Sequence, residues 1–341
     1  MKYAFGVDVG GTTVKLGLFS REGELLEKQE LPTRTENGGE AILPDVAAAI
    51  DACLRRRDVP KRDVLGVGIG VPGPVDDDGN VNRCVNLNWG VFNLHRTLSA
   101  LTGLPVKAGN DANVAALGEY YDGGGRGSRS MLMVTLGTGI GGGFIWNGQI
   151  LNGAHGVGCE IGHLCVDLSS DAEECTCGKR GCAEQYASAR ALGRIAQRAL
   201  AAEPARPTLL RSAEEVSAKT VFACAAQGDA LAKELLDQLF DVLGLTIAGG
   251  CCMVDPELVV LGGGMSKAGP ALLVGVVPRF RHHMFHACKD TKFALATLGN
   301  DAGIYGCFRL ALEAAGRNSS ARPVVADDHI GQNVAAFDRV P

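Results

Sequence analysis

The sequence of 341 residues predicts an α/β protein with two domains of related construction and a cleft between them. Three observations lead to this prediction. Strand patterns alternate with helical patterns along the chain. A strand–glycine–strand motif occurs twice, at residues 6–17 and 136–143, as expected of a duplicated unit. The length also favours two domains over one.

The N-terminal segment is expected to form three strands before any helix. Apolar runs predict these strands at residues 3–8, 14–19 and 25–31. Gly10 and Gly11 lie between the first two, so the pattern is strand–turn–strand. A P-loop or a Rossmann motif needs a helix directly after its glycines, so neither is indicated.

Helical spacing of apolar residues and short apolar runs beside glycine or proline predict the remaining elements. Helices are expected at residues 40–57, 94–102, 111–120, 229–253 and 303–315. Strands are expected at residues 64–71, 106–108, 131–136, 142–146, 258–261 and 293–297. We therefore expect a small domain at residues 1–110, completed by the last helix at about 303–315, and a large domain at residues 111–302. Residues 316–341 are polar and are assigned to a tail of unknown role.

Composition indicates a soluble protein of a reducing compartment. Hydrophobic residues make up 46% and charged residues 21%, and the net charge of −5 disfavours nucleic-acid binding. Asp8 interrupts the N-terminus before an apolar run reaches signal-peptide length, and no stretch is judged apolar enough to span a membrane. Most of the twelve cysteines, such as Cys53 and Cys252, lie in apolar contexts. We expect a cytoplasmic protein with neither a nucleic-acid nor a membrane partner.

Residues 159–184 contain the densest group of potential metal ligands. The candidate ligands are His163, Cys175, Cys177 and Cys182. One imidazole and three thiolates match a closed tetrahedral zinc site, so the zinc would be structural; the alternative is three unligated thiols in a loop. Glu160 and Glu184 flank the set, and carboxylates accept hydrogen bonds from hydroxyl-rich ligands.

Three glycine loops together favour a nucleotide-binding cleft. The first, residues 8–15, combines Asp8 with bare backbone amides that can bind phosphate oxygens, and Asp8 could hold Mg²⁺ through water. The second spans residues 135–143, and the third, residues 262–264, ends a strand and leaves room for a base or ribose. Taken singly, each loop has an alternative: a turn whose glycines only supply a positive φ.

Asp111 is the candidate general base, because it follows a short strand and opens a helix beside Asn110. A carboxylate there can take a proton from a hydroxyl that attacks a phosphoryl group. Asn110 can donate and accept hydrogen bonds, which suits a polyol. The alternative is that Asp111 only caps the helix.

These motifs resemble those of the ROK family (repressors, open reading frames, kinases), within the sugar kinase/actin-like, ribonuclease H-like ATPase fold. The resemblance rests on residues 8–12, 136–141 and 175–184 and covers about residues 3–315. It is strongest to the ATP-dependent glucokinases of the family, across residues 66–74, 85–89 and 110–118. Cys159 departs from the pattern, since similar sequences often have glycine there.

The resemblance implies phosphorylation of glucose at O6 with ATP, Mg²⁺ and a structural Zn²⁺, in a homodimer or homotetramer. Asp111 would be the base. The sugar would be held by Asn110, Glu160, His163 and Glu184 and lined by Gly73 and Asn86, and His163 would use one ring nitrogen for the sugar and the other for zinc. The nucleotide side would comprise Asp8, Gly10, Gly11, Thr12, Thr138, Gly139 and Gly263.

Four alternatives remain open from the sequence. A kinase of fructose, mannose or N-acetylmannosamine would keep the chemistry and change the sugar. Polyphosphate could replace ATP, although no basic tract is present to bind it. A sugar-sensing repressor of the same family would need a helix-turn-helix ahead of the first strand, for which Tyr3 leaves no room. A zinc-ribbon interaction module would leave the glycine loops unexplained.

Overall fold

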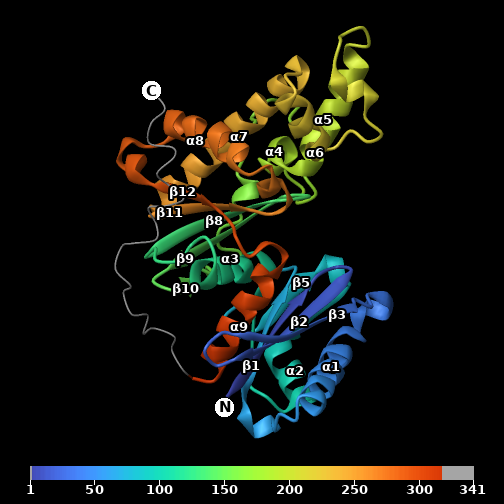
Figure 1. Cartoon of the computed structure of the whole chain (residues 1–341), viewed down its shortest axis with the longest axis vertical. Helices are drawn as coiled ribbons and strands as arrows, with labels where there is room; N and C mark the ends of the chain where they lie inside the picture. Colours follow the sequence, from blue (N-terminus) through green and yellow to red (C-terminus); the bar gives the residue numbers. More distant parts are fainter. Residues whose placement is uncertain (1, 317–341) are drawn as a thin grey trace. The chain divides into compact units, whose positions relative to one another are not determined.

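The structure is a computed structural model that describes residues 2–316 (Figure 1). The chain divides into two compact units. Within the described residues, the first comprises residues 2–129, 143–158 and 298–316, and the second comprises residues 130–142 and 159–297. The boundary expected between residues 110 and 111 therefore falls inside the first unit. The expected tail beyond residue 316 lies outside the described residues.

The first unit is built on a five-stranded sheet in the order β3-β2-β1-β4-β7. Its strands are β1 (Tyr3–Val9), β2 (Thr13–Ser20), β3 (Leu25–Pro32), β4 (Val64–Val71) and β7 (Val106–Asn110). The first three pair antiparallel, so the expected strand–turn–strand start is confirmed, whereas β4 and β7 extend the sheet in parallel. A two-stranded sheet, β5 (Asn80–Cys84) and β6 (Trp89–Asn93), was not expected from the sequence.

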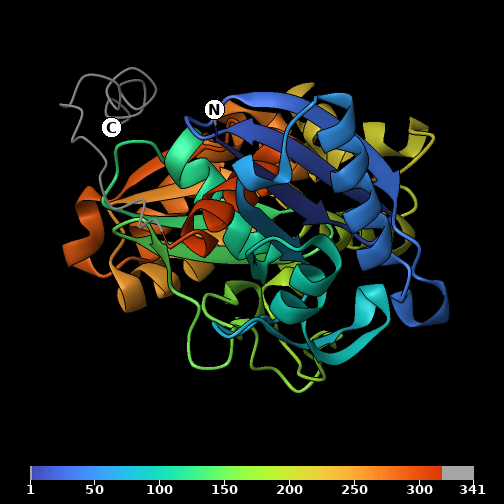
Figure 2. The ribbon, with the colours of Figure 1, turned by 90° about the horizontal axis from the view of Figure 1, so that it is seen from below.

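Helices cover both faces of this first sheet (Figure 2). Phe5, Val7 and Val9 of β1 belong to a buried cluster with α1 (Ile42–Arg56) and α2 (Leu94–Thr102). Because side chains alternate along a strand, Ala4 faces the opposite side and packs with Phe308 of α9 (Ala302–Ala314). That side also carries α3 (Asp111–Asp122), which packs closely on α9.

Glycines allow α9 to lie unusually close to its neighbours. A Cβ atom on Gly6 of β1 would collide with the Ile304 carbonyl oxygen, and one on Gly68 of β4 would collide with the Cys307 carbonyl oxygen. A Cβ on Gly306 of α9 would likewise meet the backbone of α3. The helix is therefore fixed to the sheet and to α3 by backbone contact, which also fixes the residues at its N-terminal end.

The second five-stranded sheet repeats the strand order of the first, as β10-β9-β8-β11-β12. Its strands are β8 (Ser130–Leu136), β9 (Ile140–Trp146), β10 (Gln149–Ile150), β11 (Leu258–Gly262) and β12 (Lys292–Leu295). As in the first sheet, the last two strands join in parallel. The duplication expected from the two glycine motifs is thus confirmed in the topology.

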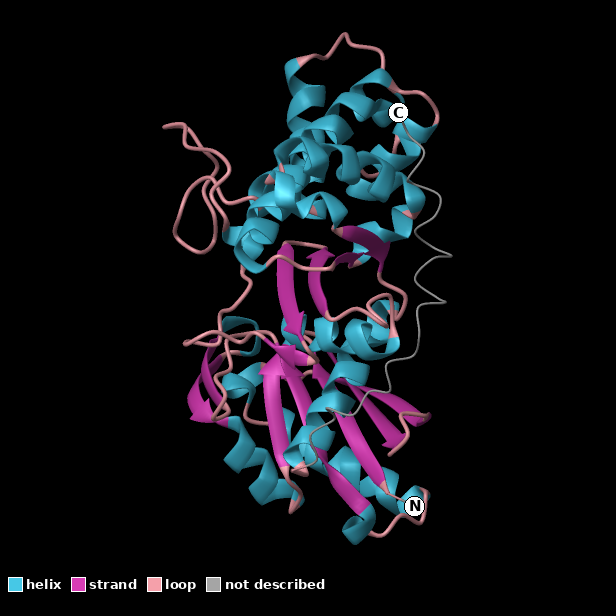
Figure 3. Cartoon of the chain, turned by 90° about the vertical axis from the view of Figure 1, so that its left-hand side faces the viewer, coloured by secondary structure: helices cyan, strands magenta, loops and turns pink. Residues whose placement is uncertain are grey.

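The second unit is largely helical beyond its strands (Figure 3). Its helices are α4 (Glu184–Ala187), α5 (Ala189–Ala202), α6 (Ala218–Ala226), α7 (Ala230–Val254) and α8 (Pro270–His283). Helix α7 packs against α8, α6 and α4, and is the central helix of this unit.

Helix α7 corrects two expectations drawn from the sequence. Its 25 residues are long and apolar enough to cross a membrane by length and composition alone, contrary to the expectation that no stretch is. Of its most apolar window, 61% is buried inside the protein, as in the core helix of a globular domain. Cys252, near its C-terminal end, was expected in an apolar context but is exposed.

Candidate functional site

The first glycine loop joins β1 to β2 in the first unit. The Gly10 N–H donates to the Thr13 carbonyl (3.0 Å), and the Thr33 hydroxyl donates to the Gly10 carbonyl (2.7 Å). Neither Gly10 nor Gly11 has a positive φ, so the alternative that they only serve a left-handed turn is wrong. A Cβ on Gly11 would meet nothing closer than the Asn86 carbonyl at 3.9 Å. Neither backbone conformation nor packing within the described chain therefore requires glycine at position 11.

Asp8 precedes this loop and lies at the end of β1. It pairs in register with Lys15 of β2, whose ammonium is 4.0 Å from the Asp8 carboxylate. On its other side the carboxyl packs on α9, where a Cβ on Gly303 would come within 2.5 Å of it. Burial raises the pKa of Asp8, Lys15 opposes the rise, and Asp301 adds to it. A cation bound at Asp8 would favour its ionised form.

Asn110 and Asp111 form the junction between β7 and α3. Asn110 caps the helix: its Oδ1 accepts from the N–H groups of Ala112 and Asn113 at 3.0 and 3.2 Å. Its Nδ2 donates to the Gly73 carbonyl at 3.3 Å, which brings these two predicted sugar residues together. Asp111 is the first helical residue, half-buried, and its Oδ1 accepts from the Ala112 N–H at 2.8 Å. The capping role that was the alternative for Asp111 thus belongs to Asn110.

Two further predicted residues of the first unit, Thr12 and Asn86, are exposed. Asn86 lies in the short turn at Val85–Leu87, between β5 and β6, and its carbonyl is the nearest group to Gly11. The phosphate-side loop and one sugar-side residue are therefore close neighbours within this unit.

The second unit brings the four predicted metal ligands together. One ligand atom from each of His163, Cys175, Cys177 and Cys182 lies within 4.8 Å of all the others. The Cys177 and Cys182 sulfurs are 3.6 Å apart, and the Cys175 sulfur is 3.6 Å from His163 Nδ1. Their loop is held by backbone hydrogen bonds, including Val166 N–H to the Gly181 carbonyl (2.8 Å).

This arrangement fits a tetrahedral zinc ion. Zinc–sulfur bonds of about 2.3 Å and a zinc–nitrogen bond of about 2.0 Å imply tetrahedral edges of roughly 3.8 Å between sulfurs and 3.5 Å between sulfur and nitrogen. Desolvation and the neighbouring thiols raise the pKa of Cys182 to about 12, so without a cation this sulfur would stay protonated. A bound cation reverses that preference, since it stabilises thiolates. The four donors therefore make chemical and geometric sense as one metal site.

The predicted sugar-binding carboxylates lie on either side of His163. The Glu160 carboxylate is 4.0 Å from His163 Nε2, and the Glu184 carboxylate is 4.0 Å from Nδ1. Glu184 also accepts a hydrogen bond from the Cys175 thiol at 3.1 Å. With Nδ1 directed at the sulfurs, Nε2 is the nitrogen that faces Glu160.

The second glycine loop lies against Glu184. A Cβ on Gly139 would lie 2.5 Å from Glu184 Oε2, so the bare backbone of this loop is in contact with the carboxylate. Gly137 and Gly139 both lack a positive φ, and a Cβ on Gly137 would meet nothing within 4 Å. Thr138 between them is exposed. The structure thus joins residues predicted for the sugar and residues predicted for the phosphates.

Gly263 lies at the end of β11 with a φ of +79°, in the region that favours glycine. A Cβ there would lie 2.6 Å from the Leu136 carbonyl oxygen, at the start of the second glycine loop. Gly263 therefore has both a conformational and a packing reason to be glycine, unlike Gly11 and Gly137.

Some residues around the candidate site were missed by sequence reasoning. Gly303 and Asp301, which adjoin Asp8, are almost 300 residues away along the chain, so no local pattern could find them. Cys159 has a φ of +68°, a left-handed conformation that explains why similar sequences often have glycine there. The sequence showed that Cys159 departs from the pattern, but it did not show the left-handed backbone at this position.

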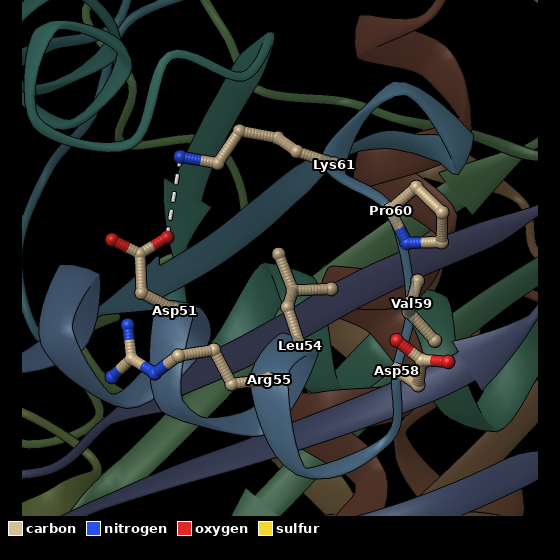
Figure 4. Close-up of a pocket in the computed structure, with 7 residues that line it drawn as sticks. All are labelled: Asp51, Leu54, Arg55, Asp58, Val59, Pro60 and Lys61. Carbon is tan, nitrogen blue, oxygen red and sulfur yellow. Dashed lines mark ion pairs between the residues drawn. The ribbon is translucent and has the colours of Figure 1, made fainter.

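A hollow of about 420 Å³ on the surface of the first unit contains none of these residues (Figure 4). It is formed by the end of α1 and the following turn, where Asp51 pairs with Lys61 at 3.2 Å. Its lining is Asp51, Leu54, Arg55, Asp58, Val59, Pro60 and Lys61. Because none of the predicted site groups reaches this hollow, we do not assign it to the candidate site.

Two sheets of the same strand order, each starting with a strand–glycine–strand hairpin, define the two-domain sugar kinase/actin-like fold. The chain belongs to the ROK family, whose model matches residues 4–314. It is 40% identical to a glucokinase of Halalkalibacterium halodurans over 309 residues, which are 89% of this chain and 93% of that protein.

Two further relatives bear on the activity. A ROK family glucokinase from Streptomyces griseus, solved in complex with glucose and AMPPNP, has a TM-score of 0.72 and 34% identity, and the match covers 91% of this chain and 99% of that one. The N-acetylgalactosamine kinase AgaK of a Shewanella species is 30% identical over 311 residues, 89% of this chain and 94% of that protein. Family members with different sugars are thus both similar to this chain.

Proposed function

We propose that this protein is a glucokinase that transfers the γ-phosphoryl group of ATP to O6 of glucose. The observation that carries the proposal is similarity along nearly the whole chain to glucokinases, including one solved with glucose and an ATP analogue. The identity of 40% to a glucokinase exceeds the 30% to the N-acetylgalactosamine kinase, which favours glucose as the sugar.

On the sugar side, we propose that Glu160, His163 and Glu184 hold the hydroxyl groups. The positions of the two carboxylates, 4.0 Å from the two ring nitrogens of His163, support this role. A zinc ion bound by the three thiolates and Nδ1 would supply a rigid cross-link and no reactive position. It would leave Nε2 of His163 as the hydrogen-bonding atom for a sugar hydroxyl. Gly73, Asn86 and Asn110 are the other residues that we propose for the sugar.

On the nucleotide side, the proposed contacts are Asp8, Gly10, Gly11, Thr12, Thr138, Gly139 and Gly263. The argument from glycine supports this, because Gly11 and Gly137 have ordinary φ angles and open space at the missing Cβ. Since neither turn geometry nor packing accounts for glycine at these positions, close approach of a ligand to the backbone is the remaining reason for it. Mg²⁺ bound to ATP would neutralise phosphate charge, with Asp8 holding it through water.

We propose Asp111 as the general base. Its carboxylate would take the proton from the glucose O6 hydroxyl as that oxygen bonds to the γ-phosphorus and the bond to the β-phosphate oxygen breaks. Transfer of the proton would come late, because phosphoryl transfer is largely dissociative. The main contribution of the protein would be to position the two substrates and exclude water.

The test is a coupled assay that follows ADP formation with ATP, Mg²⁺ and a panel of sugars: glucose, mannose, fructose, N-acetylmannosamine and N-acetylgalactosamine. We expect the highest kcat/KM with glucose. A higher value with another sugar would assign the protein to that kinase class, and phosphate transfer from polyphosphate in place of ATP would change the donor. No transfer to any sugar would refute the proposal. Size-exclusion chromatography with light scattering tests the proposed homodimer or homotetramer, and fractionation tests the proposed cytoplasmic location.

A further inference from the structure

A fourth cysteine, Cys165, lies beside the zinc-ligand set without belonging to it. Its backbone forms an isolated antiparallel bridge with that of the ligand Cys182. The bridging bonds run from the Val166 N–H to the Gly181 carbonyl (2.8 Å) and from the Ala183 N–H to the Leu164 carbonyl (2.9 Å). These bonds flank the two cysteines, so Cys165 and Cys182 form a non-hydrogen-bonded pair.

That register brings the two side chains onto one face at close range. In a non-hydrogen-bonded antiparallel pair the Cα atoms lie about 4.5 Å apart, within the range of roughly 4.4–6.8 Å that a disulfide spans. The Cys165 thiol now lies 3.3 Å from the Asp167 carbonyl and 3.7 Å from the Arg180 carbonyl. Gly181, with a φ of +79° and no Cβ, leaves space around this sulfur. Rotation about the Cα–Cβ bond to another staggered position would turn it toward Cys182.

Solvent exposure differs between Cys165 and Cys182 and assigns them different roles in oxidation. Cys165 is exposed, whereas Cys182 is buried. A small oxidant therefore reaches Cys165 before Cys182, and Cys182 is the neighbouring sulfur that can resolve the oxidised form. Cys177, the exposed member of the ligand set, offers a competing route in which the ligands oxidise among themselves.

We propose that Cys165 is an oxidative modification site whose disulfide with Cys182 dismantles the zinc site. The Cys165 thiolate attacks a hydroperoxide such as H₂O₂, giving a sulfenic acid and hydroxide. The Cys182 thiolate then attacks the sulfenic sulfur, forming the S–S bond and releasing a second hydroxide. The two sulfurs lose two electrons in all, and the peroxide takes them up.

This proposal rests on the proposed zinc site, and it adds that oxidation of Cys165 would control zinc binding there. With Cys182 in a disulfide, only His163, Cys175 and Cys177 remain as ligands, and zinc affinity falls. Glu184 follows Cys182 by two residues and accepts a hydrogen bond from Cys175, so loosening of the ligand set reaches the proposed sugar contacts. A thiol reductant together with zinc restores the reduced, metal-bound loop.

The test measures zinc and disulfides directly, without a kinase assay. Zinc content of the purified full-length protein is measured first, and release during H₂O₂ treatment is followed with a chromogenic chelator. We expect zinc release to be roughly tenfold slower in Cys165→Ser than in the wild type, because the accessible thiol outside the ligand set is gone. Cys252→Ser, which removes an exposed cysteine of α7, is the matched control and should release zinc at the wild-type rate. Cys165→Ala serves as a second variant if the serine variant folds poorly.

Peptide mapping without reductant identifies the bond. Cleavage after Lys and Arg and before Asp gives fragments 130–166, 171–179 and 181–190, which separate Cys165 from the other loop cysteines except Cys159. We expect fragments 130–166 and 181–190 to be joined in the wild type and separate in Cys165→Ser. Equal zinc release in the two proteins, a bond only between the second and third fragments, or a protein purified without zinc would overturn the proposal. None of these outcomes depends on which sugar, if any, is phosphorylated.

Discussion

A single methyl group at Gly139 should weaken glucose binding while the fold stays intact. Its Cβ would lie 2.5 Å from Glu184 Oε2, whereas ordinary contact begins at about 3.4 Å, so the carboxylate must move by about 0.9 Å. The carboxylate is the end of a flexible side chain, and Gly139 has an ordinary φ, so stability should change little. A hydrogen bond to a charged group contributes about 1.5–3 kcal/mol, and its loss weakens binding roughly 10- to 150-fold.

Isothermal titration of Gly139→Ala with glucose, in the absence of ATP, measures this loss without contributions from the phosphate site. Gly137→Ala is the control, because it adds the same methyl group two residues away where nothing lies within 4 Å. We expect Gly137→Ala to bind glucose as the wild type does and both variants to keep the wild-type melting temperature. Unchanged glucose affinity in Gly139→Ala, or an equal loss in Gly137→Ala, would refute the argument that Glu184 holds the sugar.

Three further predictions concern the base, the metal and the magnesium site. Asp111→Asn should lower kcat by about 10²–10⁴-fold while glucose affinity by titration stays unchanged, and near-wild-type turnover would remove Asp111 from the role of base. Chelation of zinc should lower the melting temperature and abolish measurable glucose binding; wild-type affinity in a stripped, folded protein would contradict the sugar role of the loop. Because burial raises the pKa of Asp8, protons should compete with Mg²⁺ at a higher pH than for an ordinary aspartate. Mg²⁺ titrations of activity from about pH 8 to 5 should show a loss of apparent Mg²⁺ affinity at low pH in the wild type and a much weaker pH dependence in Asp8→Asn. Equal pH profiles in the two proteins would count against Asp8 as the magnesium site.

Local sequence patterns predicted the amphipathic helices, which bury one face, and the strands whose apolar residues are mostly buried. Strand β4 has the predicted bounds, and α1 begins two residues after and ends one residue before the predicted range. Strands β5 and β6 were missed because they form a small, partly exposed sheet in which Val91 is 73% exposed. Helix α8 was missed because it contains Pro278 and Gly275, both poor helix formers. Gly275 is there because a Cβ would collide with the Phe240 ring, a contact that no local pattern shows.

In the candidate site, too, the features set by neighbouring residues could be predicted, whereas those set by long-range contacts could not. The cysteine motif predicted a ligand set that the structure brings together, because its members lie within twenty residues of one another. Which of Asn110 and Asp111 caps α3 could not be predicted, since both residue types cap helices well. The contact between Gly139 and Glu184 joins a strand hairpin to the far end of the cysteine loop, so it depends on the tertiary fold.

A bound metal would add order to a loop that has little regular secondary structure. Between β10 and α4 the chain forms a three-residue turn at Ile161–His163 and two isolated bridges, Cys165 with Cys182 and Glu174 with Arg180. Side-chain hydrogen bonds, such as that from the Tyr186 hydroxyl to the Asp167 carboxylate (2.6 Å), add to them. Glu160 and Glu184 lie near the two ends of this segment, yet both must be held near His163 if they are to grip one sugar. Ordering a backbone costs about 1–2 kcal/mol per residue, and a loop with few buried apolar contacts cannot offset that cost by packing. A tetrahedral metal cross-link that uses His163 itself would offset this cost and fix the imidazole between the carboxylates, so the metal would determine sugar affinity without touching the reacting atoms.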